Sequence, residues 1–393
     1  MNISLFDTFI DRRQTNSIKW QKFDEGVIPM WVADMEFATP EVITQALSRR
    51  IEHPIFGYTS APPSLVEAVA DYCAQRHQWT IEPGCLSWIP GVLPAITAAV
   101  RIAGQPGDEI IVFPPVYHPL LHIPEKTGRT RVDVPLKYKK EQSRQSNEND
   151  NENHNEGRWE IDFDSLEAAF TDRTAAILLS SPHNPMGVMF SDAELFKLAA
   201  LCSDHNVLLI SDEIHCDLIL SHEKKHIPTS LAAREYHQSV ITIMSPSKTF
   251  NLAGANCSFT HITDPDLLKQ FNAECLYAVP FVPTLSYTAA EAAYADGWEW
   301  HRNLIDYLRG NHDYLHTVIN NTGQLSMDKL EATYLAWIDT SQLMPEDAND
   351  FFKAAGVGLS PGSQFGHKHY QRLNFACSRE QLESGVDRML NAL

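Results

Sequence analysis

The sequence predicts an α/β protein whose mostly parallel β-sheet is covered by helices, with a smaller α+β domain after it. Short apolar runs rich in β-branched residues alternate with helical patterns through the first two-thirds of the chain. Such an alternation is typical of βαβ units, whose parallel sheet is buried on both faces. The length of 393 residues also exceeds what one small core usually serves, which favours two domains.

The elements follow one another in a regular order. The candidate strands of the large sheet span 110–113, 131–134, 176–180, 207–211 and 240–244, and the candidate helices span 64–78, 94–104, 163–170 and 191–205. Several of these helices begin with Ser, Asp or Pro, which suit helix starts.

After about residue 285 the pattern changes. A helix-rich stretch at 286–320 is followed by a candidate strand at 329–339, a loop at 356–366, a strand at 372–377 and a terminal helix. We therefore expect a large domain over 49–285 and a small domain formed by 1–48 and 286–393.

One stretch, 139–157, interrupts the large domain and has no apolar residue. It cannot bury enough surface to offset the entropy cost of ordering, so we expect a flexible polar loop.

Charge and composition argue against several classes of partner. The formal net charge of −19 disfavours nucleic acids and anionic membranes. There is no apolar run of about 18 residues to span a membrane, and no basic stretch precedes an apolar one as in a secretory signal. Seven scattered cysteines without a CxxC pair are typical of reduced thiols in a cytoplasmic protein. Histidine spacing indicates no metal site.

Lys248 lies in the segment SPSKTFNLAG (245–254), directly after the last central strand. Open α/β sheets bind ligands at the carboxyl ends of their strands. The hydroxyls of Ser245, Ser247 and Thr249 suit a phosphate, and a desolvated amine suits a Schiff base. By itself the pattern fits a plain strand-to-loop lysine equally well.

Asp212 follows the strand VLLIS and also lies at a carboxyl end. A buried carboxylate needs a partner, and a protonated pyridine nitrogen is one such partner. A helix cap or an arginine pair is the plainer alternative. His215, three residues on, would reach Asp212 if the segment were helical, as a hydrogen-bond donor behind it.

Asn184 lies in SSPHNPMG (180–187), after the strand AAILLS. Prolines on both sides fix the turn and present the amide at the sheet edge, where it could donate to a phenolate oxygen. When this motif is considered by itself, a turn-forming asparagine is the plainer explanation.

Together, Asn184, Asp212 and Lys248 end successive strands at spacings of 28 and 36 residues. This order resembles the fold-type I pyridoxal 5′-phosphate enzymes, with an aspartate-aminotransferase-like fold. Further segments are similar to the C–S β-lyase branch, the MalY/PatB-type cystathionine β-lyases and cystalysin. They are PMWVADMEF (29–37), HPIFGYTS (53–60), IPGVLPAI (89–96), FPPVYHPL (113–120), EATYLAWID (331–339) and RLNFAC (372–377).

The resemblance implies roles for individual residues. Lys248 would hold the cofactor as a Schiff base and move the Cα proton, Asp212 would pair with the pyridine nitrogen, and Tyr117 would stack on the ring. Asn184 would contact the ring oxygen and the substrate. Arg372 would bind the substrate α-carboxylate through a bidentate pair. Tyr117 as a core aromatic and Arg372 as an interdomain ion pair are the structural alternatives.

The resemblance also implies a phosphate site and a homodimer. The phosphate would lie at a helix N-terminus, and its contacts would come from Gly91, Val92, Leu93, Ser245, Ser247 and, from the neighbouring subunit, Tyr58. Many related aminotransferases have an arginine eight residues after the lysine, where this chain has Asn256. This departure favours elimination over amino-group transfer.

The resemblance therefore implies a lyase that converts L-cystathionine or a related cysteine S-conjugate to pyruvate, ammonia and a thiol. A class I/II aminotransferase is the alternative enzyme. A regulatory protein that binds a protein partner, with secondary lyase activity, is the alternative from another class.

Overall fold

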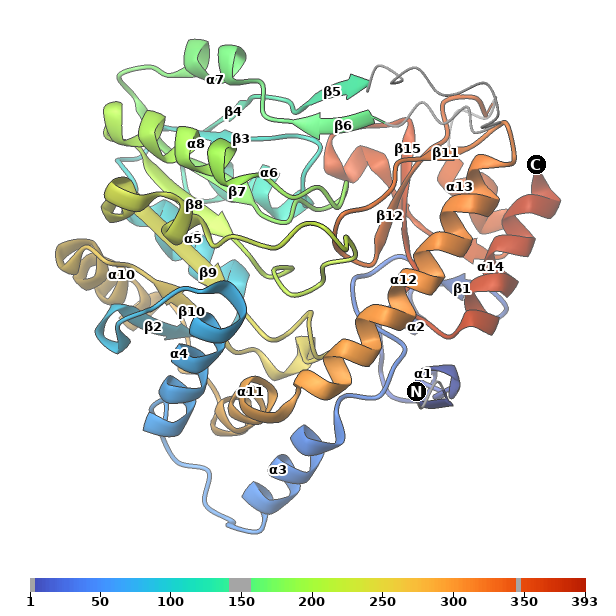
Figure 1. Cartoon of the computed structure of the whole chain (residues 1–393), viewed down its shortest axis with the longest axis horizontal. Helices are drawn as coiled ribbons and strands as arrows, with labels where there is room; N and C mark the ends of the chain where they lie inside the picture. Colours follow the sequence, from blue (N-terminus) through green and yellow to red (C-terminus); the bar gives the residue numbers. More distant parts are fainter. Residues whose placement is uncertain (1–3, 141–156, 344–347) are drawn as a thin grey trace.

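A seven-stranded sheet with helices on both faces forms the centre of the computed structural model, which describes residues 4–140, 157–343 and 348–393 (Figure 1). The strand order is β2, β10, β9, β8, β7, β3, β4, and β10 pairs antiparallel with both of its neighbours. The other neighbouring pairs are parallel, so the predicted α/β fold is confirmed. The strands are β2 (Leu86–Ile89), β3 (Glu109–Val112), β4 (Thr130–Asp133), β7 (Thr174–Ser180), β8 (Leu208–Asp212), β9 (Val240–Met244) and β10 (Ser258–His261).

Successive residues of each strand point to opposite faces, which gives the sheet two cores. Ile110 packs with apolar residues of α5, α6 and α10 on one face. Ile111 packs with those of α7, α8 and α9 on the other. The helices of this region are α4 (Pro63–His77), α5 (Val92–Ile102), α6 (His118–Lys126), α7 (Phe163–Ala169), α8 (Asp192–Asp204), α9 (Thr229–Ala232) and α10 (Pro265–Ala278).

A smaller antiparallel sheet lies toward the C-terminus, with the order β11, β12, β15, β14. Its strands are β11 (Ser326–Met327), β12 (Leu335–Asp339), β14 (Ser360–Pro361) and β15 (Tyr370–Asn374), and the helices around it are α12 (Trp298–Asn320), α13 (Ala348–Ala354) and α14 (Arg379–Ala392). Figure 1 shows α12 crossing the molecule from the small sheet toward α11 (Thr284–Asp296).

The N-terminal segment joins this second region. Its elements are α1 (Ser4–Asp7), α2 (Ile18–Gln21), β1 (Ile28–Pro29) and α3 (Glu41–Ile51), and β1 pairs in parallel with β13 (Val357–Gly358). Phe6, Met30 and Phe352 share one hydrophobic core. Helix α3 runs through the predicted domain boundary at residue 48, and the division of the chain into two domains stays a prediction.

Several element boundaries differ from the sequence expectations. The predicted loop at 356–366 contains β13, β14 and a 3₁₀ turn at Gly362–Phe365. The last strand begins at Tyr370 and ends at Asn374, two residues before its predicted start and three before its predicted end. Helix α5 begins at Val92 because Gly91, with a φ of +114°, is its N-cap.

The predicted polar loop at 139–157 is bounded by a hairpin. Strand β5 (Lys137–Lys140) pairs antiparallel with β6 (Gly157–Glu160), so Lys139, Lys140 and Gly157 belong to strands and correct the loop boundaries. The remainder of this prediction, 141–156, lies outside the described residues.

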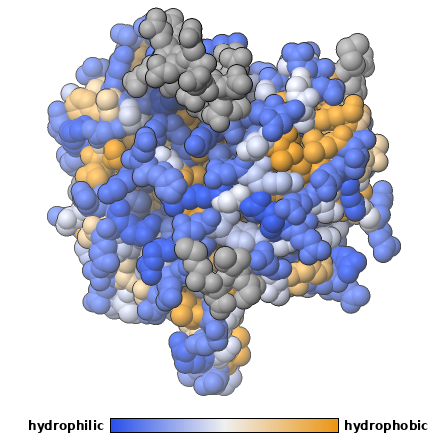
Figure 2. Space-filling model, turned by 45° about the vertical axis from the view of Figure 1, so that its right-hand side comes forward, coloured by the Kyte–Doolittle hydropathy of each residue, from blue (hydrophilic) through white to orange (hydrophobic). Residues whose placement is uncertain are grey.

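Hydrophilic residues dominate the face of the molecule in Figure 2, and hydrophobic ones form smaller patches between them. In the described part of the chain, no helix combines the length and the apolar character needed to cross a membrane.

Candidate active site

A cavity of about 370 Å³ opens where β7, β8 and β9 end. Because these strands are parallel, the residues that follow them meet at one edge of the sheet. The cavity brings together ten of the twelve predicted site residues, namely Gly91, Val92, Leu93, Tyr117, Asn184, Asp212, His215, Ser247, Lys248 and Arg372. Ser245 and Tyr58 do not line it.

Lys248 points its amine at the cavity floor. Its Nζ donates a hydrogen bond of 2.5 Å to the carbonyl oxygen of Ala33. Burial lowers the pKa of Lys248 to about 8, against the opposing attraction of Asp34. A larger share of the amine is therefore neutral near physiological pH, which a nucleophile or a base requires.

Asp212 is 4% exposed at the end of β8. Its Oδ1 accepts a hydrogen bond of 3.2 Å from the N–H of Ile214. Burial raises the pKa of Asp212 to about 7, although this hydrogen bond and the nearby Lys248 oppose the increase. Such a carboxyl would be stabilised in its charged form by a cationic ligand nitrogen.

Arg372 and Asn184 form the opposite wall, with 4% of each exposed. Nη1 of Arg372 donates to Oδ1 of Asn184 at 3.0 Å, and Nη2 donates to the carbonyl of Trp31 at 2.9 Å. Burial lowers the pKa of Arg372 to about 10, and its Nε has no hydrogen-bond partner in the part of the chain that the structure describes. The hydrogen-bond partners of the guanidinium are thus neutral groups. Because its positive charge has no anionic hydrogen-bond partner there, the guanidinium suits a carboxylate ligand.

The N-terminus of α5 forms a concave end of the cavity. Gly91, Val92 and Leu93 line it together with Asn256, so free backbone N–H groups of the first helical turn face the ligand space. A Cβ added to Gly91 would lie 3.8 Å from Oδ1 of Asn256. These neutral donors and the helix dipole suit a phosphate.

Ser245 does not line the cavity, but it contacts a residue that does. Its Oγ donates to the carbonyl of Cys257 at 2.6 Å and lies 2.8 Å from Oγ of Ser247, which does line the cavity. Ser245 can therefore orient Ser247 in this arrangement.

His215 is 3% exposed and lies in a turn, so the helical segment that would bring it within reach of Asp212 is not formed. Its Nδ1 has no hydrogen-bond partner among the described residues, and burial lowers the pKa of His215 to about 3. The ring is therefore neutral, and it packs edge-on to Tyr334.

Tyr58 lies away from the cavity of its own chain. It is 97% exposed and contacts Phe281, with ring centroids 5.7 Å apart.

The sequence interpretation missed the backbone of 31–33 as part of the site. The carbonyl of Ala33 accepts from both Lys248 and Tyr334, and the carbonyl of Trp31 accepts from Arg372. Backbone acceptors leave no side-chain signal in a sequence, although the segment PMWVADMEF (29–37) that contains them resembles the C–S β-lyase branch.

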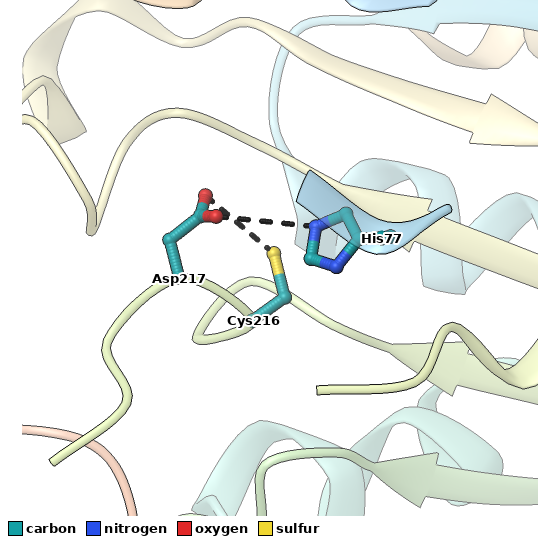
Figure 3. A group of neighbouring side chains, drawn as sticks. All are labelled: His77, Cys216 and Asp217. Atoms are coloured by element: carbon teal, nitrogen blue, oxygen red, sulfur yellow. Dashed lines mark hydrogen bonds and ion pairs between the residues drawn. The ribbon is translucent and has the colours of Figure 1, made fainter. Parts of the chain in front are cut away.

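A second group of polar side chains, formed by His77, Cys216 and Asp217, lies close together in the structure (Figure 3). These residue types can bind a metal, but the hydroxyl of Tyr72 lies among them. It is 2.9 Å from Nε2 of His77, 3.4 Å from Sγ of Cys216 and 3.1 Å from Oδ2 of Asp217. Oδ2 of Asp217 also accepts from Thr249 at 3.2 Å. We assign the group to a hydrogen-bond network that supports the segment carrying Lys248.

The comparisons with known proteins agree with this site. The model of the family described as "Aminotransferase class I and II" matches residues 25–389. The chain belongs to the class I and II aminotransferase family. Within it, the chain is 37% identical to cystathionine β-lyase PatB of Bacillus subtilis, covering 99% of both chains. The predicted family resemblance is thereby confirmed.

Two solved structures of this family extend the likeness to the fold. The pyridoxal-phosphate-bound C–S lyase of Staphylococcus hominis has a TM-score of 0.88 and 32% identity, over 99% of this chain and 97% of the other. Cystalysin of Treponema denticola, which contains pyridoxal 5′-phosphate, has a TM-score of 0.90 and 28% identity, over 98% of both chains.

Proposed function

We propose that this chain is a pyridoxal 5′-phosphate-dependent carbon–sulfur β-lyase. Its substrate is L-cystathionine or a related cysteine S-conjugate, and its products are pyruvate, ammonia and a thiol. From cystathionine and one water, the thiol is homocysteine. The observation that carries the proposal is the meeting of Lys248, Asp212 and Arg372 in one cavity. The relatives named as lyases support the same reaction class.

The cavity fits the cofactor. The buried carboxyl of Asp212 suits the pyridine nitrogen, and Oδ1 of Asn184 is taken by Arg372, which leaves its amide nitrogen to donate to the ring oxygen. Tyr117 lines the wall between them. The helix N-terminus at Val92 and Leu93, with Ser247, suits the phosphate.

The residues of this chain divide the chemistry between them. When bound, pyridoxal phosphate supplies a sink for the electrons left at the substrate Cα. Arg372 binds the α-carboxylate and so orients the Cα–H bond toward Lys248. The amine of Lys248, at its lowered pKa of about 8, accepts that proton. The departing thiol has an unperturbed pKa of about 8.5, so it leaves as a thiolate with little acid assistance.

Amino-group transfer is the alternative function, because other members of the family are named as aminotransferases. The identity of the products distinguishes the two functions. Purified holoenzyme incubated with L-cystathionine should release pyruvate, ammonia and thiol in equal amounts without an oxo-acid acceptor. Formation of a 2-oxo acid only in the presence of an amino acceptor would replace the lyase proposal with an aminotransferase.

The raised pKa of Asp212 predicts a pH dependence in the cofactor-free protein. Because its folded pKa of about 7 exceeds the ordinary value of 3.8, the folded state binds more protons between these values. The contribution of Asp212 to unfolding free energy should fall as pH rises through this window, by about 1.4 kcal/mol per unit. In Asp212→Asn this fall should be absent in denaturant titrations at each pH. Equal slopes in both proteins would contradict an unpaired Asp212.

The proposal includes a homodimer with shared active sites, in a cytoplasmic enzyme. Exposed apolar side chains in two neighbouring segments support it, namely Ile51, Ile55, Phe56, Tyr58, Leu276, Tyr277 and Phe281. Burying such a patch against a second copy would remove its exposed area from water.

Tyr58 tests the shared site. We expect the holoenzyme to sediment as a dimer, and Tyr58→Phe to weaken cofactor binding about tenfold through one lost phosphate hydrogen bond. Tyr277→Phe, a matched change of another exposed tyrosine, should leave cofactor affinity unchanged. A monomeric holoenzyme, or equal cofactor affinities in all three proteins, would contradict the shared site.

A further inference from the structure

The outer part of the active-site cavity contains residues that the proposed reaction does not use. Trp31, His118, Gln364 and Phe365 line the cavity beside Arg372. Of the carboxylates in the described chain, only Asp212 lines this cavity, and the proposed function assigns it to the cofactor nitrogen. The outer part therefore faces the substrate with basic, amide and aromatic groups.

Lys22 places a cation next to Trp31, one of the residues that line the cavity. Its Nζ lies 3.7 Å from the centroid of the Trp31 ring, a close cation–π contact. Trp31 is itself held in place, because its Nε1 donates to the carbonyl of Lys19 at 3.1 Å and its carbonyl accepts from Arg372 at 2.9 Å. One fixed aromatic residue thus separates the ammonium of Lys22 from the guanidinium of Arg372.

His118 lies on the adjoining wall. Its ring meets those of Tyr117 and Phe365 edge-on, at centroid distances of 5.0 Å and 6.2 Å. Its Nδ1 is buried, and no described residue forms a hydrogen bond with it. An unpaired buried polar atom costs free energy, and a polar ligand nearby would relieve that cost if the ring shifted toward it.

The charges that shift the pKa values of His118 and Lys22 are positive. Burial, and then the positive charges of Arg372, His122 and Lys22, lower the pKa of His118. Burial and Arg372 lower the pKa of Lys22. An anionic ligand group placed here would be attracted by the positive charges of Lys22 and Arg372.

We propose that Lys22 and His118 form a second anion subsite, which selects cysteine S-conjugates whose leaving thiol carries a carboxylate. Arg372 binds the α-carboxylate, and the subsite binds the acidic group at the far end of the thioether. This inference rests on the proposed lyase function, for which it names a substrate class.

Two isosteric substrates separate charge from shape. S-carboxyethyl-L-cysteine and its amide, S-carbamoylethyl-L-cysteine, have the same length and differ in the terminal charge. The wild-type holoenzyme should turn over the acid with about tenfold higher kcat/KM, because a charge-assisted contact is made only with the acid. The difference should appear mainly in KM.

Variants assign the preference to the subsite. Lys22→Gln and His118→Gln should each reduce the ratio of kcat/KM for the acid to kcat/KM for the amide. Lys22→Arg should retain the preference, because the charge is kept. The exposed Lys353, which does not line the cavity, serves as the matched control, and Lys353→Gln should leave the preference unchanged. Equal kcat/KM for acid and amide, or a preference that persists in Lys22→Gln, would overturn the subsite.

A binding measurement keeps this test independent of turnover. Calorimetric titration of the holoenzyme should give tighter binding of glutarate, with two carboxylates, than of butyrate, with one. The difference should shrink in Lys22→Gln and not in Lys353→Gln. If no S-conjugate yields pyruvate, the lyase proposal fails while these titrations still decide on the subsite. Equal affinities for the two acids would overturn it.

Discussion

Replacing Lys248 with alanine is expected to lower the rate of pyruvate formation from cystathionine by about 10⁴-fold, the upper part of the range for losing a general base. Lys248 is the lysine that lines the cavity, and its amine lies at the floor near Asp212 with a pKa lowered to about 8. No neighbouring group in the lining offers a second amine for the Cα proton. Steady-state assays with saturating pyridoxal phosphate measure the loss.

The exposed Lys269, in the middle of α10, provides the matched control. Lys269→Ala should keep the wild-type rate, and circular dichroism should report the wild-type fold for both variants. A Lys248→Ala protein with more than a tenth of wild-type activity would contradict the assigned role. A cell phenotype fully retained by an inactive Lys248→Ala protein would instead favour the regulatory alternative.

Replacing Arg372 with leucine should lower kcat/KM by about 10²- to 10³-fold, the range for removing one partner of a buried charge pair. The guanidinium is the buried cation opposite Asp212, and its partners are neutral, an amide oxygen and a backbone carbonyl. A substrate carboxylate would supply the missing negative charge. Arg372→Lys should also lose most of the activity, because an ammonium cannot form the bidentate pair.

Cofactor content separates this effect from a loss of the site. Absorbance of bound cofactor in Arg372→Leu should remain near that of the wild type, because Arg372 does not line the phosphate end. Arg302→Leu changes an exposed residue of α12 and is the matched control, so it should leave both kcat/KM and cofactor content unchanged. Unchanged KM for cystathionine in Arg372→Leu would show that another group binds the α-carboxylate.

The centre of the fold could be predicted because its strands are continuous apolar runs, which parallel sheets covered on both faces require. The antiparallel strands β2 and β10 were missed for a physical reason. Every residue of β10 is buried, yet three of the four are Ser, Thr and His. The hydroxyls of Ser258 and Thr260 donate to backbone carbonyls of β2. These polar side chains are therefore buried with their hydrogen bonds made, and the strand has no continuous apolar run that a sequence reading could detect.

The candidate site, like the fold, could be predicted in part. Asp212 is the last residue of β8, and Asn184 and Lys248 follow β7 and β9, so the topology alone brings them together. Arg372 lies on β15 of the small sheet, and only the family resemblance connected it to the cavity. The carbonyls of Trp31 and Ala33, and the cation of Lys22 next to Trp31, depend on the path of the N-terminal segment, which no motif specifies.

The central claim is that pyridoxal phosphate is held at Lys248, and borohydride reduction tests it most directly. Reduction should fix the cofactor covalently, and peptide mass mapping should find one modified lysine per chain, in the peptide that contains SPSKTF (245–250). Modification of a different lysine, or a holoenzyme that yields no modified peptide after reduction, would contradict the account.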